Sequence, residues 1–420
     1  MERVKKTKLA VAPTARFALP KKQTGVLSEE TRQLVLEHTE RLFTPPTAPY
    51  AEDALVAIVR DFVKRVPGFE LRADRYQNLL VKWKGNGSKQ KGPGLAFSAH
   101  LDHPGFLYKG TSKGVRTATF HGGVPESYFV GSRVRFYDGK SFEACATARI
   151  KSTSRDQDRL IVAHFDQFVG TARKGMFGMW DLTPGTLAGS RFHARVCDDL
   201  IGAAALLTTL EELAKAKHPE PVMGIFTRAE ETGFIGCQGL LRSKAIKGDW
   251  SVIGLECSPK RVTAKVGKGP VIRVGDAGTI FDPALTHLLQ GVAADLRREH
   301  EDFVFQRALM DGGRCESTAY NMWGVPAGGL CLALGNYHNC APNGSIEPEY
   351  VNWQDYEGLV ALMLGAAKSW RGGAKSGNMQ AGLDRIWKRE RTRLEESASR
   401  IRAMPASRTV ESRTAKSRKK

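Results

Sequence analysis

Residues 223–236 of the chain read Met-Gly-Ile-Phe-Thr-Arg-Ala-Glu-Glu-Thr-Gly-Phe-Ile-Gly, and this stretch decides the fold. Its apolar start, residues 223–226, is long enough for one buried strand of a parallel sheet. Two adjacent carboxylates, Glu230 and Glu231, follow the strand. In open α/β sheets the chemistry collects beyond the carboxyl ends of strands, and neighbouring acids there repel each other unless a cation or a shared proton relieves them. The alternative is a solvated strand-to-helix loop.

Other apolar runs also end in polar residues. Buried strands are predicted over residues 95–99, 250–255 and 325–334. His100 ends the first of these, and Asp102 two positions later can accept the hydrogen bond that fixes a ligand imidazole, although His-x-Asp also occurs by chance. Glu256 closes the second, where a charge is costly unless it is paired or coordinated. His338 follows the third.

Asp198 and Asp199 begin a strongly amphipathic helix that runs to about residue 217. The positive end of the helix dipole favours anions, so capping is one explanation for the pair. A second aspartate is not needed for capping, and Asp198 therefore remains a candidate metal ligand.

Together these positions form an ordered set of five candidate ligands: His100, Asp198, Glu231, Glu256 and His338. Mixed histidine and carboxylate sets suit zinc, cobalt or manganese. If one carboxylate bridges two ions and each ion takes two further ligands, the pair can activate water and polarise a carbonyl. Glu230, a carboxylate beside them that is not a ligand, is then the candidate general acid and base.

Charge is concentrated at the two ends of the chain. The 420 residues carry a formal charge of +19, with 41% hydrophobic residues and 43 glycines. Residues 1–25 contribute +6 and residues 371–420 contribute +10, so the part between them is close to neutral. Such tails more often aid solubility or weak polyanion contact than specific recognition.

Seven cysteines without a CxxC pair indicate free thiols in a reducing compartment. No apolar run approaches the roughly 18 residues that a membrane span needs. The short run at residues 9–12 stops at Pro13 and is too short for a signal peptide. We therefore expect a cytoplasmic protein with no membrane partner.

The alternation of strand and helix patterns predicts an α/β catalytic domain over residues 26–104 and 186–370. Its sheet is expected to be mixed, mostly parallel and sandwiched by helices. Residues 105–185 differ, because short β-like runs there are separated by glycine, aspartate and lysine turns. They predict a small all-β domain inserted into the catalytic domain.

The two ends of the chain are predicted to lie outside these domains. Residues 1–25 are expected to form a disordered basic arm. Residues 371–420 are expected to form a basic linker and an amphipathic helix over 383–404, which is either a partner surface or a solvated appendage.

Five motifs carry a resemblance to a known family: residues 99–102 (Ala-His-Leu-Asp), 197–202 (Cys-Asp-Asp-Leu-Ile-Gly), 230–233 (Glu-Glu-Thr-Gly), 255–256 (Leu-Glu) and 337–339 (Tyr-His-Asn). The chain resembles the co-catalytic di-metal exopeptidase clan, and most of all its glutamyl/tetrahedral aminopeptidase branch. The resemblance implies a zinc-exopeptidase-like fold with two divalent ions, zinc being the first candidate. It implies one ion on His100, Asp198 and Glu256 and a second on Asp198, Glu231 and His338. Asp198 would be the bridge, Glu230 the general acid and base, and Asp102 the partner that orients His100.

The position of the insert selects the branch. The interval from His100 to Asp198 is long enough to hold the predicted β domain, as in the tetrahedral aminopeptidases. In the carboxypeptidase and deacylase relatives the inserted domain comes before the last histidine instead. The resemblance therefore implies self-assembly through the inserted domain.

Several positions depart from the usual pattern of the branch. Leu200 stands where arginine is usual, and Glu256 where aspartate is more common. Residues 312–318 differ from the usual Gly-Gly-Thr-Asp, and Asn339 from the usual serine. These positions border the substrate pocket, so they bear on substrate choice more than on metal chemistry.

Three functions follow from these observations. The first is an aminopeptidase that cleaves the N-terminal residue from peptide substrates through a metal-activated water. The second uses the same site as an N-acyl amino acid deacylase or a di/tripeptidase. The third, from another class, is a non-catalytic scaffold whose basic tails bind polyanions through their phosphates.

Overall fold

The computed structural model describes residues 17–20, 25–87, 92–112, 114–246, 249–372 and 377–402. The predicted basic arm and the end of the C-terminal tail lie largely outside the described residues. Of the arm, Phe17 packs edge-on against Phe192 with 5.0 Å between ring centroids. The chain divides into two compact units, Met1–Ala374 and Lys375–Lys420.

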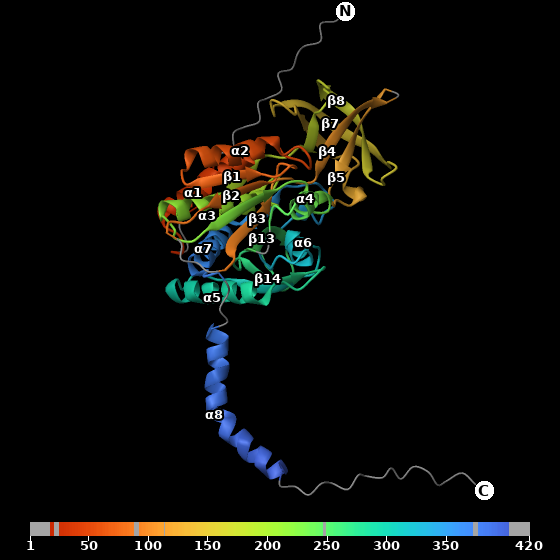
Figure 1. Cartoon of the computed structure of the whole chain (residues 1–420). Coiled ribbons are helices and arrows are strands. Elements are labelled where there is room, and N and C mark those ends of the chain that lie inside the picture. The colour runs from red at the N-terminus through yellow and green to blue at the C-terminus, as the bar shows by residue number, and fades with distance from the viewer. Residues whose placement is uncertain are drawn as a thin grey trace, which may run out of the picture. The chain divides into compact units, whose positions relative to one another are not determined.

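Eight strands form one mixed sheet in the order β1-β2-β12-β3-β13-β16-β14-β15 (Figure 1). Their bounds are β1 Phe69–Ala73, β2 Leu79–Trp83, β12 Val222–Thr227, β3 Gly94–His100, β13 Trp250–Pro259, β16 Ala327–Leu334, β14 Val271–Asp276 and β15 Gln306–Met310. The four central strands β12, β3, β13 and β16 are parallel neighbours. Antiparallel pairings join β1 to β2, β2 to β12, and β14 to β16. The mixed sheet is as expected, and its parallel centre brings four carboxyl ends to one edge.

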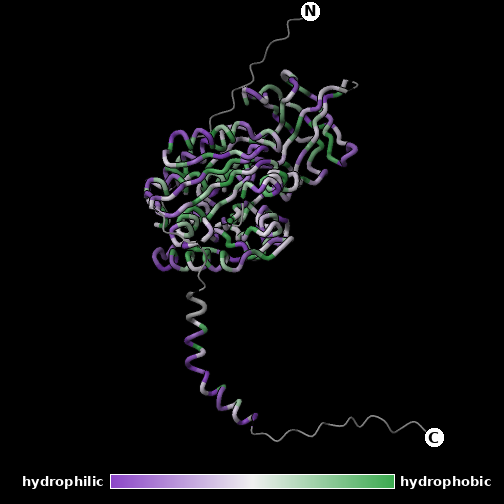
Figure 2. The backbone as a smooth tube through the Cα atoms, in the orientation of Figure 1, coloured by the Kyte–Doolittle hydropathy of each residue, from purple (hydrophilic) through white to green (hydrophobic). Residues whose placement is uncertain are grey.

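Helices cover both faces of the sheet. One face carries α1 Glu29–Phe43, α2 Asp53–Arg65, α3 Leu200–Lys215, α5 Pro283–Glu299 and α7 Trp353–Ser369. The other carries the shorter helices α4 Ile235–Arg242 and α6 Glu316–Met322. Each face has its own apolar core, and Figure 2 shows hydrophobic residues along the strands between them. The prediction of a sheet flanked by helices is confirmed.

Six strands within the predicted insert close into a small barrel, in the order β4-β5-β8-β7-β6-β9. Their bounds are β4 Gly105–Ser112, β5 Val115–His121, β6 Arg133–Tyr137, β7 Ala144–Arg155, β8 Ile161–Gly170 and β9 Phe177–Trp180. Aromatic rings fill the interior: Phe106 packs edge-on against Phe120 and Trp180, each at 4.9 Å. The barrel thus has an apolar core of its own.

A third, three-stranded sheet was not predicted from the sequence. Its strands are β10 Gly185–Ala188, β11 Arg191–Ala194 and β17 Glu349–Asn352. It joins a segment just before the Asp198–Asp199 pair to one just after His338. These short strands carry no distinctive periodicity and pair across a long sequence separation. The small sheet nonetheless brings two candidate ligands towards each other.

The second unit contains helix α8, Gly377–Arg402. It starts earlier than the predicted amphipathic helix and covers most of it. Among the described residues, no helix is long and apolar enough to cross a membrane.

Candidate metal centre

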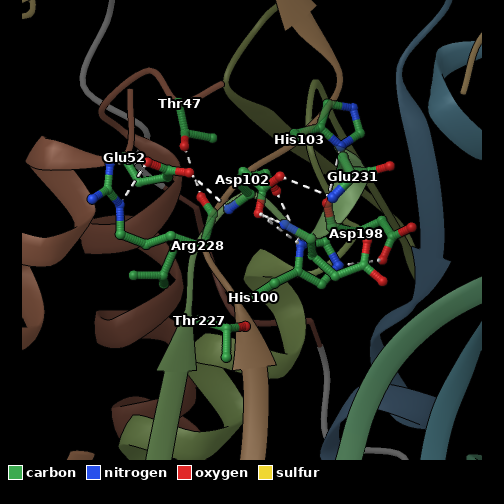
Figure 3. Close-up of polar contacts among 12 residues, drawn as sticks. Thr47, Glu52, His100, Asp102, His103, Asp198, Thr227, Arg228 and Glu231 are labelled. Atoms are coloured by element: carbon green, nitrogen blue, oxygen red, sulfur yellow. Dashed lines mark hydrogen bonds and ion pairs between the residues drawn. The ribbon is translucent and has the colours of Figure 1, made fainter. Parts of the chain in front are cut away.

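The five predicted ligands meet at the carboxyl edge of the parallel strands. His100 is the last residue of β3, and Glu256 lies within β13. Asp198 lies just before α3, Glu231 lies in the turn after β12, and His338 follows β16. The loops after parallel strands converge, so residues far apart in sequence become neighbours (Figure 3).

The first group contains His100, Asp198 and Glu256. His100 Nε2 lies 3.4 Å from Asp198 Oδ1 and 3.9 Å from Glu256 Oε1. All three residues are buried. One ligand atom from each lies within 4.8 Å of the others, which is close enough for one ion to contact all three.

The second group contains Asp198, Glu231 and His338. His338 Nε2 lies 3.2 Å from Glu231 Oε2 and 3.8 Å from Asp198 Oδ2. The two groups therefore share Asp198 through different oxygens. A third grouping, of His100, Glu230 and Glu231, places Glu230 beside both.

The two histidines are oriented as metal ligands. His338 Nδ1 lies 2.8 Å from the Gly123 carbonyl, and His100 Nδ1 lies 3.2 Å from the Asp102 carbonyl. Each Nδ1 therefore donates a proton, which leaves the lone pair of Nε2 directed at the carboxylates. His100 Nε2 and Glu231 Oε1 are buried and have no hydrogen-bond partner among the described residues. Ligand atoms without partners fit a divalent ion.

The electrostatics agree with a cation in this position. Burial, reinforced by Asp198, raises the pKa of Glu256 to about 7. Burial also raises the pKa of Glu230 well above its ordinary value, and Glu256 and Glu231 add to the effect. Burial alone would lower the pKa of His338, but Glu231 and Asp198 raise it to about 10. The buried acids thus carry more negative charge than the histidines offset, and a cation would relieve the excess.

Asp102 has a second role besides the predicted orientation of His100. Its Oδ1 lies 3.6 Å from His100 Nδ1. The same carboxylate accepts hydrogen bonds from the backbone N–H of Glu230 (2.8 Å) and of Glu231 (3.1 Å). Asp102 therefore fixes the turn that carries the candidate base and a candidate ligand.

Glu52, which was not predicted as a site residue, supports the same turn from the other side (Figure 3). Its Oε1 accepts from the Ala229 N–H (2.9 Å), and its Oε2 pairs with Arg228 (2.8 Å). Glu52 is fully buried, and burial followed by repulsion from Asp102 raises its pKa to about 7. No motif surrounds Glu52 in the sequence.

His103 was also missed, although its position three residues after His100 was a usable signal. Its Nδ1 lies 2.9 Å from the Asp198 carbonyl, and its Nε2 lies 3.0 Å from Asn339 Oδ1. Asn339 in turn donates to the Arg195 carbonyl (3.1 Å). The asparagine that replaces the usual serine therefore links two ligand-bearing loops.

Glu349, at the start of β17, connects the Asp198 and His338 loops. Its Oε2 accepts from the backbone N–H of Cys197 (2.7 Å) and of Asp198 (3.2 Å), and its Oε1 accepts from the His338 N–H (2.8 Å). The residue is completely buried. We interpret Glu349 as a positioning residue that holds two ligands in register.

We expect Glu349→Gln to weaken divalent-metal binding about 10–100-fold, the usual effect of losing a residue that orients ligands. The Gln amide would point a donor at backbone N–H groups that also donate. Metal titration against a competing chelator measures the affinity. Glu347→Gln is the matched control, since Glu347 is half-buried and its side chain bonds, among the described residues, to Asn343 and Ser345 and to no metal-ligand loop. Equal affinities in the two variants would rule out the positioning role.

Glu316 is a buried carboxylate outside the predicted set. Its Oε2 accepts from the Ser98 hydroxyl (2.9 Å), and its Oε1 has no partner among the described residues. Burial raises the pKa of Glu316 to about 7. A carboxyl with a raised folded pKa favours the folded state below its unfolded pKa of about 4.5, and this advantage disappears as the pH rises through the folded pKa.

The free energy of unfolding should therefore fall between about pH 4.5 and pH 7, and Glu316→Gln should remove about 2–3 kcal/mol of that fall. Glutamine keeps an oxygen for Ser98 and does not ionise. Denaturant unfolding of both proteins at several pH values, with metal held constant, measures the difference. Identical pH slopes would contradict the prediction.

Helices on both faces of the sheet and clustered histidines and carboxylates at its carboxyl edge define the chain as a metallohydrolase of the α/β class. The family model of M42 glutamyl aminopeptidases matches residues 78–342, which is more than half of the chain. The chain belongs to this family. It is therefore a metal-dependent peptidase that cleaves at the N-terminus of peptides, and the resemblance noted in its sequence is confirmed.

Solved structures share the fold at low sequence identity. The TET1 peptidase of Pyrococcus horikoshii is 20% identical, with 80% of this chain and 100% of that chain covered and a TM-score of 0.63. A TET aminopeptidase from a marine-sediment Thaumarchaeota archaeon is 18% identical, with 80% and 97% covered and a TM-score of 0.65. Yeast aminopeptidase 1 is 12% identical, with 81% and 98% covered and a TM-score of 0.57.

Proposed function

We propose that the chain removes N-terminal residues with two divalent ions, zinc being the first candidate and cobalt or manganese the alternatives. One ion would bind His100, Asp198 and Glu256, and the other would bind Asp198, Glu231 and His338. One observation carries the proposal: Asp198 Oδ1 faces His100 and Oδ2 faces His338. A carboxylate whose two oxygens serve two ligand groups is suited to bridge two ions.

When bound, the ions would polarise the scissile carbonyl and lower the pKa of water. Glu230 would accept the proton of the attacking water and pass it to the departing amine. Glu230 is buried, and burial raises its pKa, which makes its carboxylate a stronger base towards the attacking water. Asp102 contributes by fixing the Glu230 backbone through its N–H.

A pocket beside Glu256 indicates which side chain the substrate presents. Its cavity volume is about 30 Å³, it is partly open to solvent, and its lining includes three arginines, Arg261, Arg273 and Arg314. Arg273 is buried, bonds to the Ser258 hydroxyl (3.1 Å), and has no partner for its Nε among the described residues. Burial alone would lower the pKa of Arg273, but nearby groups that include Glu256 and Asp276 raise it, so the guanidinium is charged. Its Nε–H can still bond to a ligand, and we propose that the carboxylate of an acidic N-terminal side chain reaches this basic pocket.

Arg273→Met should lower kcat/KM for glutamyl and aspartyl substrates about 10–100-fold and leave that for leucyl substrates unchanged or higher. Loss of a charged hydrogen bond accounts for this difference. Turnover of the three aminoacyl substrates measures it, and Arg307→Met, at an exposed arginine on β15, is the control. An equal loss on all three substrates would show that Arg273 does not select the side chain.

Blocking the substrate amine separates the aminopeptidase from the deacylase on the same site. We expect release from peptides with a free α-amino group and none from their N-acetyl counterparts. Faster turnover of N-acyl amino acids would favour the deacylase alternative. Absence of both activities in metal-loaded protein would favour the non-catalytic scaffold.

Assembly and location are also proposals. We propose a homo-oligomer formed through the barrel of β4–β9, supported by the similarity to a TET1 peptidase that can assemble into a tetrahedron or an octahedral shell. Sedimentation of the chain with and without residues 105–185 would test this assembly.

We propose a cytoplasmic location, supported by the free state of all seven cysteines.

A further inference from the structure

Helix α8 leaves four large apolar side chains exposed. Leu383, Ile386, Trp387 and Leu394 are 63%, 50%, 54% and 58% exposed. At 3.6 residues per turn they fall within an arc of about 100°. Figure 2 shows short hydrophobic stretches along a largely hydrophilic helix. An apolar stripe on an exposed helix points to a surface that covers it.

Basic residues flank the stripe on both sides. At 100° per residue, Arg389, Arg393 and Arg400 border one side, and Lys388 and Arg391 border the other, where Asp384 and Glu395 also lie. Long basic side chains beside an apolar stripe can reach an anionic surface while the apolar residues insert. The following residues, 403–420, add six Lys/Arg and one Glu to the sequence.

Glu390 is the one acidic residue near the middle of the stripe, and two arginines pair with its negative charge. Arg389 Nε donates to its Oε1 (2.6 Å), and Arg393 donates to its Oε2 (2.9 Å). These bonds draw the carboxylate towards the basic flank. The stripe therefore presents no uncompensated negative charge to an anionic surface.

We propose that α8 binds an anionic lipid surface, lying in its interface with the apolar stripe inserted and the arginines at the phosphate level. Phosphate binding by nucleic acid would use the basic residues and leave the four apolar side chains exposed. A pair of α8 helices would place Glu390 in the seam and arginines opposite each other. In this arrangement the helix lies along the membrane surface and does not cross it. No membrane partner was predicted from the sequence, because no segment is long and apolar enough to span a membrane, and the proposed surface binding differs from that prediction.

Co-sedimentation with vesicles tests the proposal on the full-length protein. We expect binding to vesicles of phosphatidylcholine mixed with phosphatidylserine, no binding to phosphatidylcholine alone, and weaker binding as salt rises. A Trp387→Gln, Leu394→Gln double variant, which keeps the charge of the helix, should reduce the bound fraction about tenfold, with peptidase activity unchanged. Val262→Gln, at an exposed apolar residue (89%) in the other unit, is the control and should bind like wild type.

Three results would overturn the proposal. The first is no vesicle binding by the wild type. The second is equal binding by the double variant, which would assign the attraction to charge alone, as for a nucleic acid. The third is a concentration-dependent change in sedimentation that the double variant abolishes without any lipid, which would assign the stripe to a second copy of the chain.

Discussion

Asp198→Ala should reduce the bound metal from about two ions per chain to less than one and abolish aminopeptidase turnover. Asp198 is the only residue common to both ligand groups, so its loss removes one ligand from each. Elemental analysis of the purified protein gives the stoichiometry, and turnover of a glutamyl substrate gives the activity.

The variant should remain folded. In the metal-free protein Asp198 is one of several buried carboxylates that repel each other, and its removal relieves part of that repulsion. The melting temperature of metal-free Asp198→Ala should therefore be at least that of the metal-free wild type. Asp158→Ala, at an exposed aspartate of the barrel, is the control. Full metal content and activity in Asp198→Ala would refute the bridged site.

Glu230→Gln should lower kcat about 10²–10⁴-fold while both ions stay bound. The amide has the shape of the carboxyl but cannot take a proton from water, and the backbone bond to Asp102 is unaffected. Steady-state kinetics with a glutamyl substrate, together with elemental analysis, separates this effect from loss of metal. The KM should change much less than kcat.

Two comparisons make the Glu230 result interpretable. Glu143→Gln, at an exposed glutamate of the barrel, should behave like wild type. Asp102→Asn should also lower kcat, because an amide nitrogen would meet the N–H donors of Glu230 or Glu231. If Glu230→Gln kept near-normal kcat with full metal, another group would have to move the proton.

The fold class and the candidate metal ligands could be predicted from local patterns in the sequence. Apolar runs that end in His100, Glu256 and the Glu230–Glu231 pair are visible in the sequence, because burial of parallel strands requires continuous apolar residues. The place where such strands end is also where their chemistry gathers. The order of the motifs and the position of the insert were then sufficient to identify the family.

Only the tertiary structure revealed the residues that hold the ligands in place. Glu52, Glu316 and Glu349 belong to no recognisable motif in the sequence, and their roles arise from contacts with other segments of the chain. Arg273 likewise becomes a candidate for substrate selection only because it is buried beside Glu256 without a partner for its Nε among the described residues. Periodicity records which face of a strand or helix is buried. Which distant backbone N–H a buried carboxylate meets depends on how the strands are ordered in the sheet, and that order is set by packing of the whole chain.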